Sequence, residues 1–301
     1  MLTNFLVFTA VAFWGLSFIS TKKVLPYLTP SEIITVRLLL GAPVLYLVAR
    51  VRGTKFDFES KDRTVIIVAA IILGAHFLIQ TLGLNFTTAT NTAWLIATIP
   101  AFVAVLSRIF LKERLNLRRI TGIALGTIGV ILLVSKGNIG RLDWLYSFGD
   151  WLVLVTCLTW SVYTIITRNI TRKYRPLALS VVILLIPAVS LSLVTLISTP
   201  LAKFYNLPLE ALGWLLFLGI ACLGLAHWFW LEGLSRKGAV EVGAYLYLEP
   251  VVTTIAAGPI LGEELGLMVI LSAVLILAGV YLVERKPRIP KPLKGNQMPN
   301  D

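Results

Sequence analysis

The sequence contains little charge and few cysteines. Of its 301 residues, 14% are charged, whereas soluble domains carry roughly 25%. The two cysteines, Cys157 and Cys222, lie inside apolar stretches, and their spacing fits neither a zinc site nor a secreted disulfide framework. We therefore expect two buried thiols, and neither a metal site nor a cofactor.

Negative charge is scarcer still, with 15 acidic residues against 27 basic ones and a net charge of +12. In a soluble protein this excess would suggest a nucleic-acid partner. Here the basic residues gather in short loops between apolar segments, as membrane topology requires. With 57% hydrophobic residues and a mean hydropathy of +0.86, the composition indicates an all-α integral membrane protein that contacts the lipid bilayer and no nucleic acid.

The apolar segments have the length of membrane-spanning helices. A span needs about 20 mostly apolar residues. This length predicts ten transmembrane helices, near residues 3–21, 30–49, 64–83, 87–107, 118–135, 149–167, 176–197, 211–232, 238–259 and 265–284.

The basic residues predict how these spans are oriented. If the N-terminus is cytoplasmic, the cytoplasmic segments hold five, five, four and two basic residues in loops and five in the tail, whereas the outside segments hold five altogether. Arg37, within the second span, completes the set. This strong positive-inside bias places both termini in the cytoplasm of a multi-pass cell-membrane protein.

The second half of the chain repeats the first. A shift of 150 residues aligns Gly83 with Gly233 and Pro100 with Pro250, and a shift of 146 aligns Trp14 with a tryptophan at position 160. Duplicated sets of hydrophobic helices are typical of secondary transporters, whose substrate sites lie at the repeat interface.

Each half has an odd number of spans, so the second copy is expected to be inverted in the membrane. The two five-helix repeats would comprise residues 3–135 and 149–284. The tail, residues 285–301, is basic, rich in proline and poor in apolar residues, which predicts a disordered cytoplasmic segment.

A motif recurs in the fourth span of each half. It reads TNTAWLIATIPAFVAVLSRIFLKERL in the first copy and VEVGAYLYLEPVVTTIAAGPILGEEL in the second. With the ten-helix topology, this pair resembles the EamA-type branch of the drug/metabolite transporter superfamily. The second copy fits the pattern through Glu249-Pro250 and Leu261-Gly262-Glu263. The first departs from it, with Ile99 before the proline and Lys112 where the family has glycine.

The resemblance implies a secondary transporter of small organic metabolites such as amino acids, often acting as an exporter by alternating access around a central cavity. His76, Trp94 and Trp160 resemble in placement the pocket residues of the aromatic amino-acid exporters of this family. Four-helix relatives of this superfamily are half the length or less, so we expect this chain to function as a monomer.

Two alternatives stay open: an integral membrane enzyme and a lipid-carrier flippase. An enzyme acting on lipid-linked substrates needs convergent carboxylates. The five aspartates instead fall in loops, at a span edge or at the terminus. No Walker sequence is present, which argues against direct use of ATP.

Polar and aromatic residues at helical spacing predict which side chains line the cavity, because lipid-facing surfaces have no use for polar groups. The competing interpretations are backbone bonds for serine and threonine, interface belts for tryptophan and tyrosine, and helix packing. The candidate substrate-binding residues are Trp14, Ser17, His76, Gln80, Asn91, Trp94, Trp160, Tyr163, His227, Tyr245 and Glu249.

His76 and Glu249 are the candidates for proton coupling, because protonation of either could respond to substrate and to a proton gradient. The alternative for Glu249 is a structural pair with Arg37 or a backbone donor, and the alternative for the whole protein is facilitated diffusion.

The run GIALGTIG in the fifth span contains Gly122, Gly126 and Gly129. It superficially resembles a nucleotide-binding loop. Because it lies in an apolar stretch with no strand before it, close helix packing of the G-x-x-x-G kind is the favoured interpretation.

Overall fold

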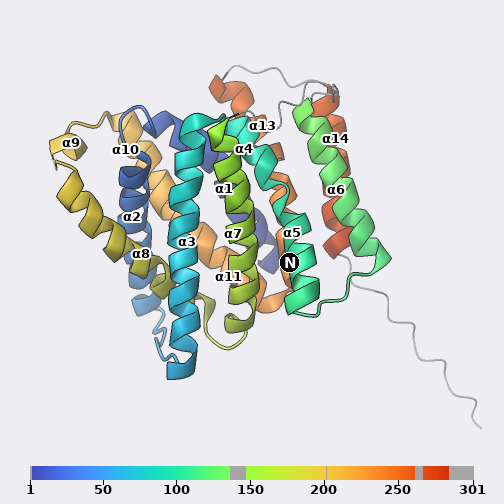
Figure 1. Cartoon of the computed structure of the whole chain (residues 1–301), viewed down its shortest axis with the longest axis horizontal. Coiled ribbons are helices and arrows are strands. Elements are labelled where there is room, and N and C mark those ends of the chain that lie inside the picture. Colours follow the sequence, from blue (N-terminus) through green and yellow to red (C-terminus); the bar gives the residue numbers. More distant parts are fainter. Residues whose placement is uncertain (1, 136–146, 201, 262–266, 285–301) are drawn as a thin grey trace, which may run out of the picture.

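The computed structural model describes residues 2–135, 147–200, 202–261 and 267–284, and these residues form helices with no β-strand (Figure 1). Seven of the described helical segments are long and apolar enough to cross a membrane, and a further apolar helix, Ile270–Glu284, is shorter. The chain is therefore an all-α membrane protein. The tail that we expect to be disordered and the motif residue Glu263 lie outside the described residues.

The helices follow one another with short connections. In the first half they are α1 (Leu2–Val24), α2 (Pro30–Val51), α3 (Ser60–Phe86), α4 (Ala89–Ile96), α5 (Ile99–Phe110) and α6 (Leu117–Ser135). In the second half they are α7 (Phe148–Ile170), α8 (Pro176–Ser198), α9 (Ala202–Tyr205), α10 (Leu209–Leu216), η2 (Phe217–Leu225), α11 (Ala226–Arg236), α12 (Ala239–Gly243), η3 (Ala244–Leu248), α13 (Glu249–Leu261) and α14 (Leu267–Glu284).

Two of the long helices begin with a capping box. At α2, the Thr29 side chain accepts from the backbone N–H of Glu32, and the Glu32 carboxylate accepts from the backbone N–H of Thr29. Ser147 and Asp150 form the equivalent reciprocal pair at α7. Such capping boxes satisfy backbone donors that have no partner inside the helix, and so they define where the helix starts.

The predicted fourth and ninth spans are each divided. The fourth is interrupted between α4 and α5, and the ninth changes from α12 through the 3-10 helix η3 to α13. Each final segment begins one residue before a proline, Pro100 or Pro250. A proline has no N–H to donate and its ring clashes with the carbonyl four residues earlier, which explains a break at this point in both spans.

The helix starts reproduce the spacing found in the sequence. The pairs α4 and α12, α5 and α13, and α6 and α14 each begin 150 residues apart. The pairs α1 and α7, and α2 and α8, each begin 146 residues apart. Five helices of the first half therefore begin at positions that correspond to helix starts in the second half.

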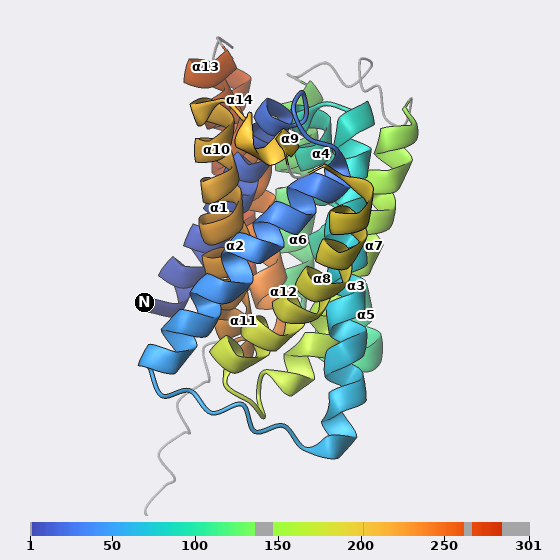
Figure 2. The same cartoon turned by 90° about the vertical axis from the view of Figure 1, so that its left-hand side faces the viewer.

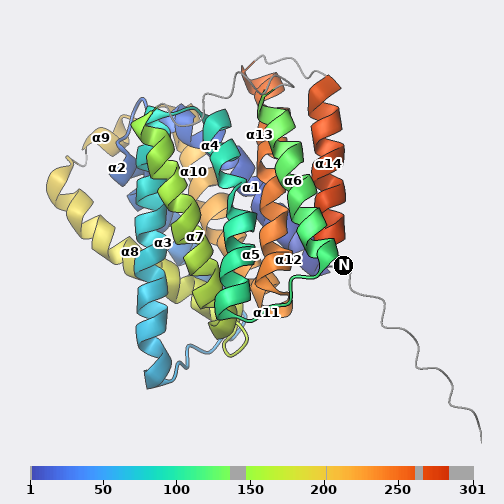
Figure 3. The same cartoon turned by 45° about the vertical axis from the view of Figure 1, so that its right-hand side comes forward.

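The helices form one bundle in which helices from the two halves pack together. The contacting pairs include α1 with α11, α3 with α7 and α2 with α8. Figure 2 shows α2 and α8 running obliquely beside the more upright α3. The helices α6 and α14 lie side by side at one edge of the bundle (Figures 1 and 3).

Glycines allow this last pair to approach closely. A Cβ on Gly122 would lie 2.7 Å from the Gly279 carbonyl oxygen, and one on Gly129 would lie 2.8 Å from the Ile276 side chain. The interpretation of GIALGTIG as a helix-packing surface is therefore confirmed.

Candidate functional site

A small cavity lies at the centre of the bundle, between helices of both halves. Its free volume is about 20 Å³, which is room for roughly one water molecule. It is lined by Trp14, Ser17, Phe18, Arg37, His76, Phe77, Gln80, Ile96, Ile99, Trp160, Leu246 and Glu249.

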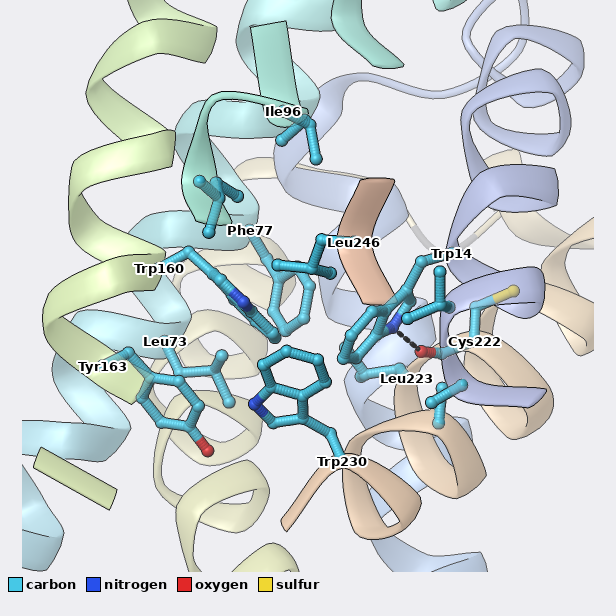
Figure 4. Close-up of a cluster of buried hydrophobic side chains, with 14 of the residues drawn as sticks. Trp14, Leu73, Phe77, Ile96, Trp160, Tyr163, Cys222, Leu223, Trp230 and Leu246 are labelled. Carbon is cyan, nitrogen blue, oxygen red and sulfur yellow. Dashed lines mark hydrogen bonds between the residues drawn. The ribbon is translucent and has the colours of Figure 1, made fainter. Parts of the chain in front are cut away.

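Aromatic rings form one wall of this cavity (Figure 4). The ring of Trp160 meets that of Trp14 edge to face at a centroid distance of 4.9 Å, and it lies 6.3 Å from that of Phe77. Trp14 is held in place by its indole N–H, which donates to the Cys222 carbonyl at 2.8 Å. Packed rings of this kind are stiff and apolar, so they suit a planar or apolar group of a ligand.

Trp230 supports this wall from α11. Its ring lies 5.3 Å from that of Trp14 and 5.6 Å from that of Trp160, and Figure 4 shows it between the two. Trp230 is not among the candidates selected from the sequence. Two signals could have identified it: it lies three residues after His227, and it is the repeat partner of Gln80 at the 150-residue offset.

His76 reaches the cavity from α3 with a defined orientation. Its Nδ1 lies 3.2 Å from the Thr156 carbonyl oxygen and 3.1 Å from the Thr159 hydroxyl. A carbonyl can only accept, so Nδ1 carries the hydrogen. In the neutral ring Nε2 is then an acceptor, available to a molecule in the cavity.

Two buried side chains of opposite charge line the same cavity. Arg37 is 3% exposed and Glu249 is 2% exposed. The Arg37 guanidinium lies 5.5 Å from the centre of the Phe77 ring, and its Nε has no hydrogen-bond partner among the described residues. No ion pair joins the two side chains within the described structure, so the alternative in which Arg37 pairs with Glu249 is not realised.

Ser17 and Gln80 complete the polar part of the lining. The Ser17 hydroxyl donates to the Trp14 carbonyl at 2.7 Å, which is the local backbone bond considered as an alternative for helical serines. Ser17 therefore combines that bond with a place at the cavity.

Five of the selected residues are not part of this lining. Asn91 donates instead to Asp150 at 2.5 Å near the start of α4. Tyr163 and His227 bond to each other at 2.5 Å, and the Tyr163 ring lies 5.4 Å from that of Trp160. Trp94 is buried in α4.

Tyr245 is displaced by the local helix type. Its hydroxyl donates to Glu284 at 2.8 Å. In a continuous α-helix, Tyr245 and Glu249 would share a face, since they are four residues apart. In the 3-10 helix η3, side chains three apart are eclipsed instead. Leu246 therefore shares the cavity with Glu249, and Tyr245 is turned away.

Polar side-chain contacts join the two halves at both ends of the bundle. At the end where α3 begins and α7 finishes, the lower end in Figure 1, Lys173 contacts Asp62 at 2.5 Å and Glu59 at 2.7 Å. At the opposite end, the Asp150 carboxylate accepts from Thr87 and Asn91, both at 2.5 Å. Each set of contacts joins the first half to the second.

The motif residue Glu113 has a structural partner in the other half. Its carboxylate accepts from the backbone N–H groups of Ala239 at 2.9 Å and Val240 at 3.5 Å, at the start of α12. A carboxylate is favoured there because the first N–H groups of a helix lack partners inside it.

A comparison with known families agrees with this architecture. The model of the EamA-like transporter family matches residues 1–135 and 147–285. The chain belongs to the EamA-like transporter family.

Curated relatives cover almost the whole of the EamA-family chain. It is 31% identical to an uncharacterized transporter of Archaeoglobus fulgidus, over 94% of this chain and 98% of that protein. It is 29% identical to the uncharacterized transporter YyaM of Bacillus subtilis, over 97% and 94%. It is 26% identical to a probable amino-acid metabolite efflux pump of Escherichia coli, over 92% and 93%.

The same EamA-family chain is similar in fold to a solved crystal structure. The TM-score is 0.75 over 93% of this chain and 95% of that one, with 19% sequence identity. The family and the names of the relatives indicate a membrane transporter rather than an enzyme.

Proposed function

We propose that this protein is a secondary transporter that exports small organic metabolites such as amino acids by alternating access around the central cavity. Its ten spans would form two inverted five-helix repeats, residues 3–135 and 149–284, with both termini in the cytoplasm and the monomer as the working unit. The named efflux pumps among the relatives support outward movement of amino-acid metabolites.

The observation that carries this proposal is the cavity lining, to which both halves contribute equivalent positions. Trp14 and Trp160 are 146 residues apart, and Ile96 and Leu246 are 150 apart. A substrate site at the interface of two repeats is the arrangement found in secondary transporters.

The helix contacts support a two-fold relation between the halves. The first span, α1, packs on the eighth, which contains α11, while the third, α3, packs on the sixth, α7. Exchanging the two halves turns one of these contacts into the other. The broken fourth and ninth spans beside the cavity also fit this class, in which discontinuous helices meet the substrate.

Glu249 and His76 are our candidates for coupling export to protons. Both line the cavity, and the charged or titratable groups around them are Arg37 from α2 and the Cys157 thiol from α7. If the Glu249 carboxylate binds either a proton or the substrate, but not both at once, transport of the substrate in one direction is coupled to transport of a proton in the other.

Proteoliposomes test the function. Purified protein is reconstituted and loaded with labelled phenylalanine, leucine or uracil, and efflux is followed with and without an imposed pH difference. We expect efflux of at least one amino acid, and efflux at least 10-fold slower in Trp160→Ala because substrate loses a ring to pack on. Trp151→Ala is the matched control, since that tryptophan is 54% exposed on the same helix.

Efflux of none of the three compounds, or efflux unaltered in Trp160→Ala, would contradict the proposal. Proton coupling is judged separately with Glu249→Gln, which keeps size but cannot titrate. If that variant still accumulates substrate against its gradient under a pH difference, Glu249 is not the coupling residue.

A further inference from the structure

The central cavity is lined by two ionisable side chains of opposite type, an arginine and a glutamate. Arg37 and Glu249 are almost completely buried, yet they are not joined by an ion pair within the described structure. Unpaired charge at membrane depth is costly, so it is kept where it serves a ligand or a pathway. The question is which ligand needs both charges at once.

Two side chains in the cavity lining have hydrogen-bond donors without partners among the described residues. Besides the Arg37 Nε, the indole N–H of Trp160 is buried without a partner among the described residues, and both side chains line the cavity. A guanidinium with an adjacent N–H donor matches the geometry of a carboxylate, which accepts several hydrogen bonds. Buried donors of this kind are normally satisfied, so a ligand that accepts from them would complete the site.

Acceptors occupy another part of the same lining. Glu249 lines the cavity, and the Thr253 hydroxyl donates to its backbone carbonyl rather than to its carboxylate. The Nε2 of His76 is also an acceptor, because Nδ1 carries the hydrogen toward the Thr156 carbonyl. A group with several N–H donors and a positive charge, such as an ammonium, matches this pair.

We propose that Arg37 binds the carboxylate and Glu249 the ammonium group of an α-amino acid zwitterion, whose side chain packs against Trp14, Phe77 and Trp160. This inference rests on the proposed function and specifies the substrate class of that same site. Both charges of an α-amino acid are attached to one carbon, which suits two opposite charges on the walls of one small cavity. The free volume of about 20 Å³ is too small for an amino acid, so binding requires the walls to separate.

Three compounds with the same phenyl ring test each charge in turn. They are phenylalanine, 2-phenylethylamine, which lacks the carboxylate, and 3-phenylpropionate, which lacks the ammonium group. Binding to the purified full-length protein is measured by calorimetry. We expect phenylalanine to bind about 10- to 100-fold more tightly than either analogue, the usual loss for one charged hydrogen-bonded group.

Two variants test which residue binds the carboxylate and which binds the ammonium group of the substrate. Arg37→Met should bind phenylalanine and 2-phenylethylamine with nearly equal affinity, because the carboxylate loses its charged partner and keeps only the Trp160 N–H. Glu249→Gln should bind phenylalanine and 3-phenylpropionate with equal affinity for the corresponding reason. If either residue had only a structural role, its replacement would weaken the binding of all three compounds by the same factor. That result would overturn the assignment.

Matched controls remove the same charges from the surface. Arg52→Met changes an arginine at the end of α2 that stacks on Trp228, and Glu210→Gln changes a side chain that is 69% exposed. Both should keep the native preference for phenylalanine. Thermal melting checks that the variants are folded, and the comparison of the three compounds on the native protein needs no variant.

Binding and transport separate this inference from the function on which it rests. Native protein that moves uracil but does not bind phenylalanine, or that binds an analogue as tightly as phenylalanine, overturns the zwitterion site and keeps the transporter. Native protein that binds phenylalanine with the expected preferences but moves no compound keeps the site and overturns the transporter.

Discussion

Lys112 illustrates how much one backbone position can matter. It is the non-glycine residue with left-handed backbone in the described part of the chain, with φ of 54°. Side chains disfavour this region because Cβ approaches the following carbonyl oxygen, whereas glycine adopts it freely. The departure from glycine at this position of the motif therefore has a physical cost in this protein.

Replacing Lys112 with glycine should stabilise the protein by about 1 kcal/mol, because the backbone strain disappears. The melting temperature of the detergent-solubilised protein should rise on the order of 2 °C. Gly53 provides the reverse control: its φ is 58° and a Cβ there would meet nothing within 4 Å, so Gly53→Ala should lower stability through the backbone alone. A lower melting temperature for Lys112→Gly would refute the strain argument.

Lys173 links two loops through charge. Hydrogen bonds with Asp62 and then Glu59 raise the pKa of Lys173, and hydrogen bonds with Lys173 and then Lys61 lower the pKa of Glu59. A cation whose pKa is raised by folding stabilises the folded protein fully at pH values below the pKa that it has in the unfolded chain. This stabilisation is lost as the pH rises through the pKa that it has in the folded protein. A carboxylate whose pKa is lowered by folding stabilises the folded protein fully at pH values above the pKa that it has in the unfolded chain. This stabilisation is lost as the pH falls through the pKa that it has in the folded protein.

The Glu59–Lys173 contact should therefore act fully between the ordinary pKa values of 4.5 and 10.5. Hydrogen–deuterium exchange of residues 52–60 should be faster in Lys173→Met than in the native protein at pH 7. The difference should disappear at the acid end of a titration, once both Glu59 and Asp62 are protonated. An equal difference at every pH would mean that packing, such as that of Phe58 on Tyr174, holds the loop instead.

At the scale of the helices, the sequence predicted the bounds of most long helices and distortions at Pro100 and Pro250, but not the form of those distortions. Proline after a threonine, and a serine followed three residues later by an aspartate, mark the starts of α2 and α7 in the sequence itself. Pro250 signals a distortion but not its kind. The 3-10 segment before it, η3, changes which residues share a face, and this excluded Tyr245 from the cavity.

Candidates from continuous helices were predicted best. Trp14, His76 and Trp160 lie in α1, α3 and α7, where spacing of three to four residues identifies the inward face. Asn91 lies in the first turn of a short helix, so its side chain bonds Asp150 at the end of the bundle instead. Arg37 was visible as a charge within a span, but its direction depends on how α2 packs, which spacing alone does not give.

The contact of Glu113 with α12 gives a prediction at this scale. Glu113→Ala should lower stability by about 1 kcal/mol, the usual cost of a lost N-terminal cap. Glu210→Ala removes an exposed carboxylate from the first turn of α10 and should cost less. Thermal melting of both variants checks the difference. Equal losses would show that the Ala239 and Val240 N–H groups do not depend on Glu113.

At the scale of the whole molecule, side-chain contacts join the two halves at both ends of the bundle, and the cavity between the halves is very small. Lys173 and its partners join the halves at one end, and Asp150 and its partners join them at the other. The repeat in the sequence anticipates two related halves. It does not indicate which conformation the chain adopts, since that depends on weak contacts at both ends.

Access to Ser17 tests alternating access most directly. Ser17 lines the cavity, so Ser17→Cys, with the buried Cys157 and Cys222 changed to alanine, places a single thiol there. A membrane-impermeant maleimide is applied from either face, with and without Asp150→Ala, which loosens one end. The account predicts that labelling of the thiol from that face rises and labelling from the opposite face falls. Labelling that rises from both faces together, or that occurs from neither, would contradict it.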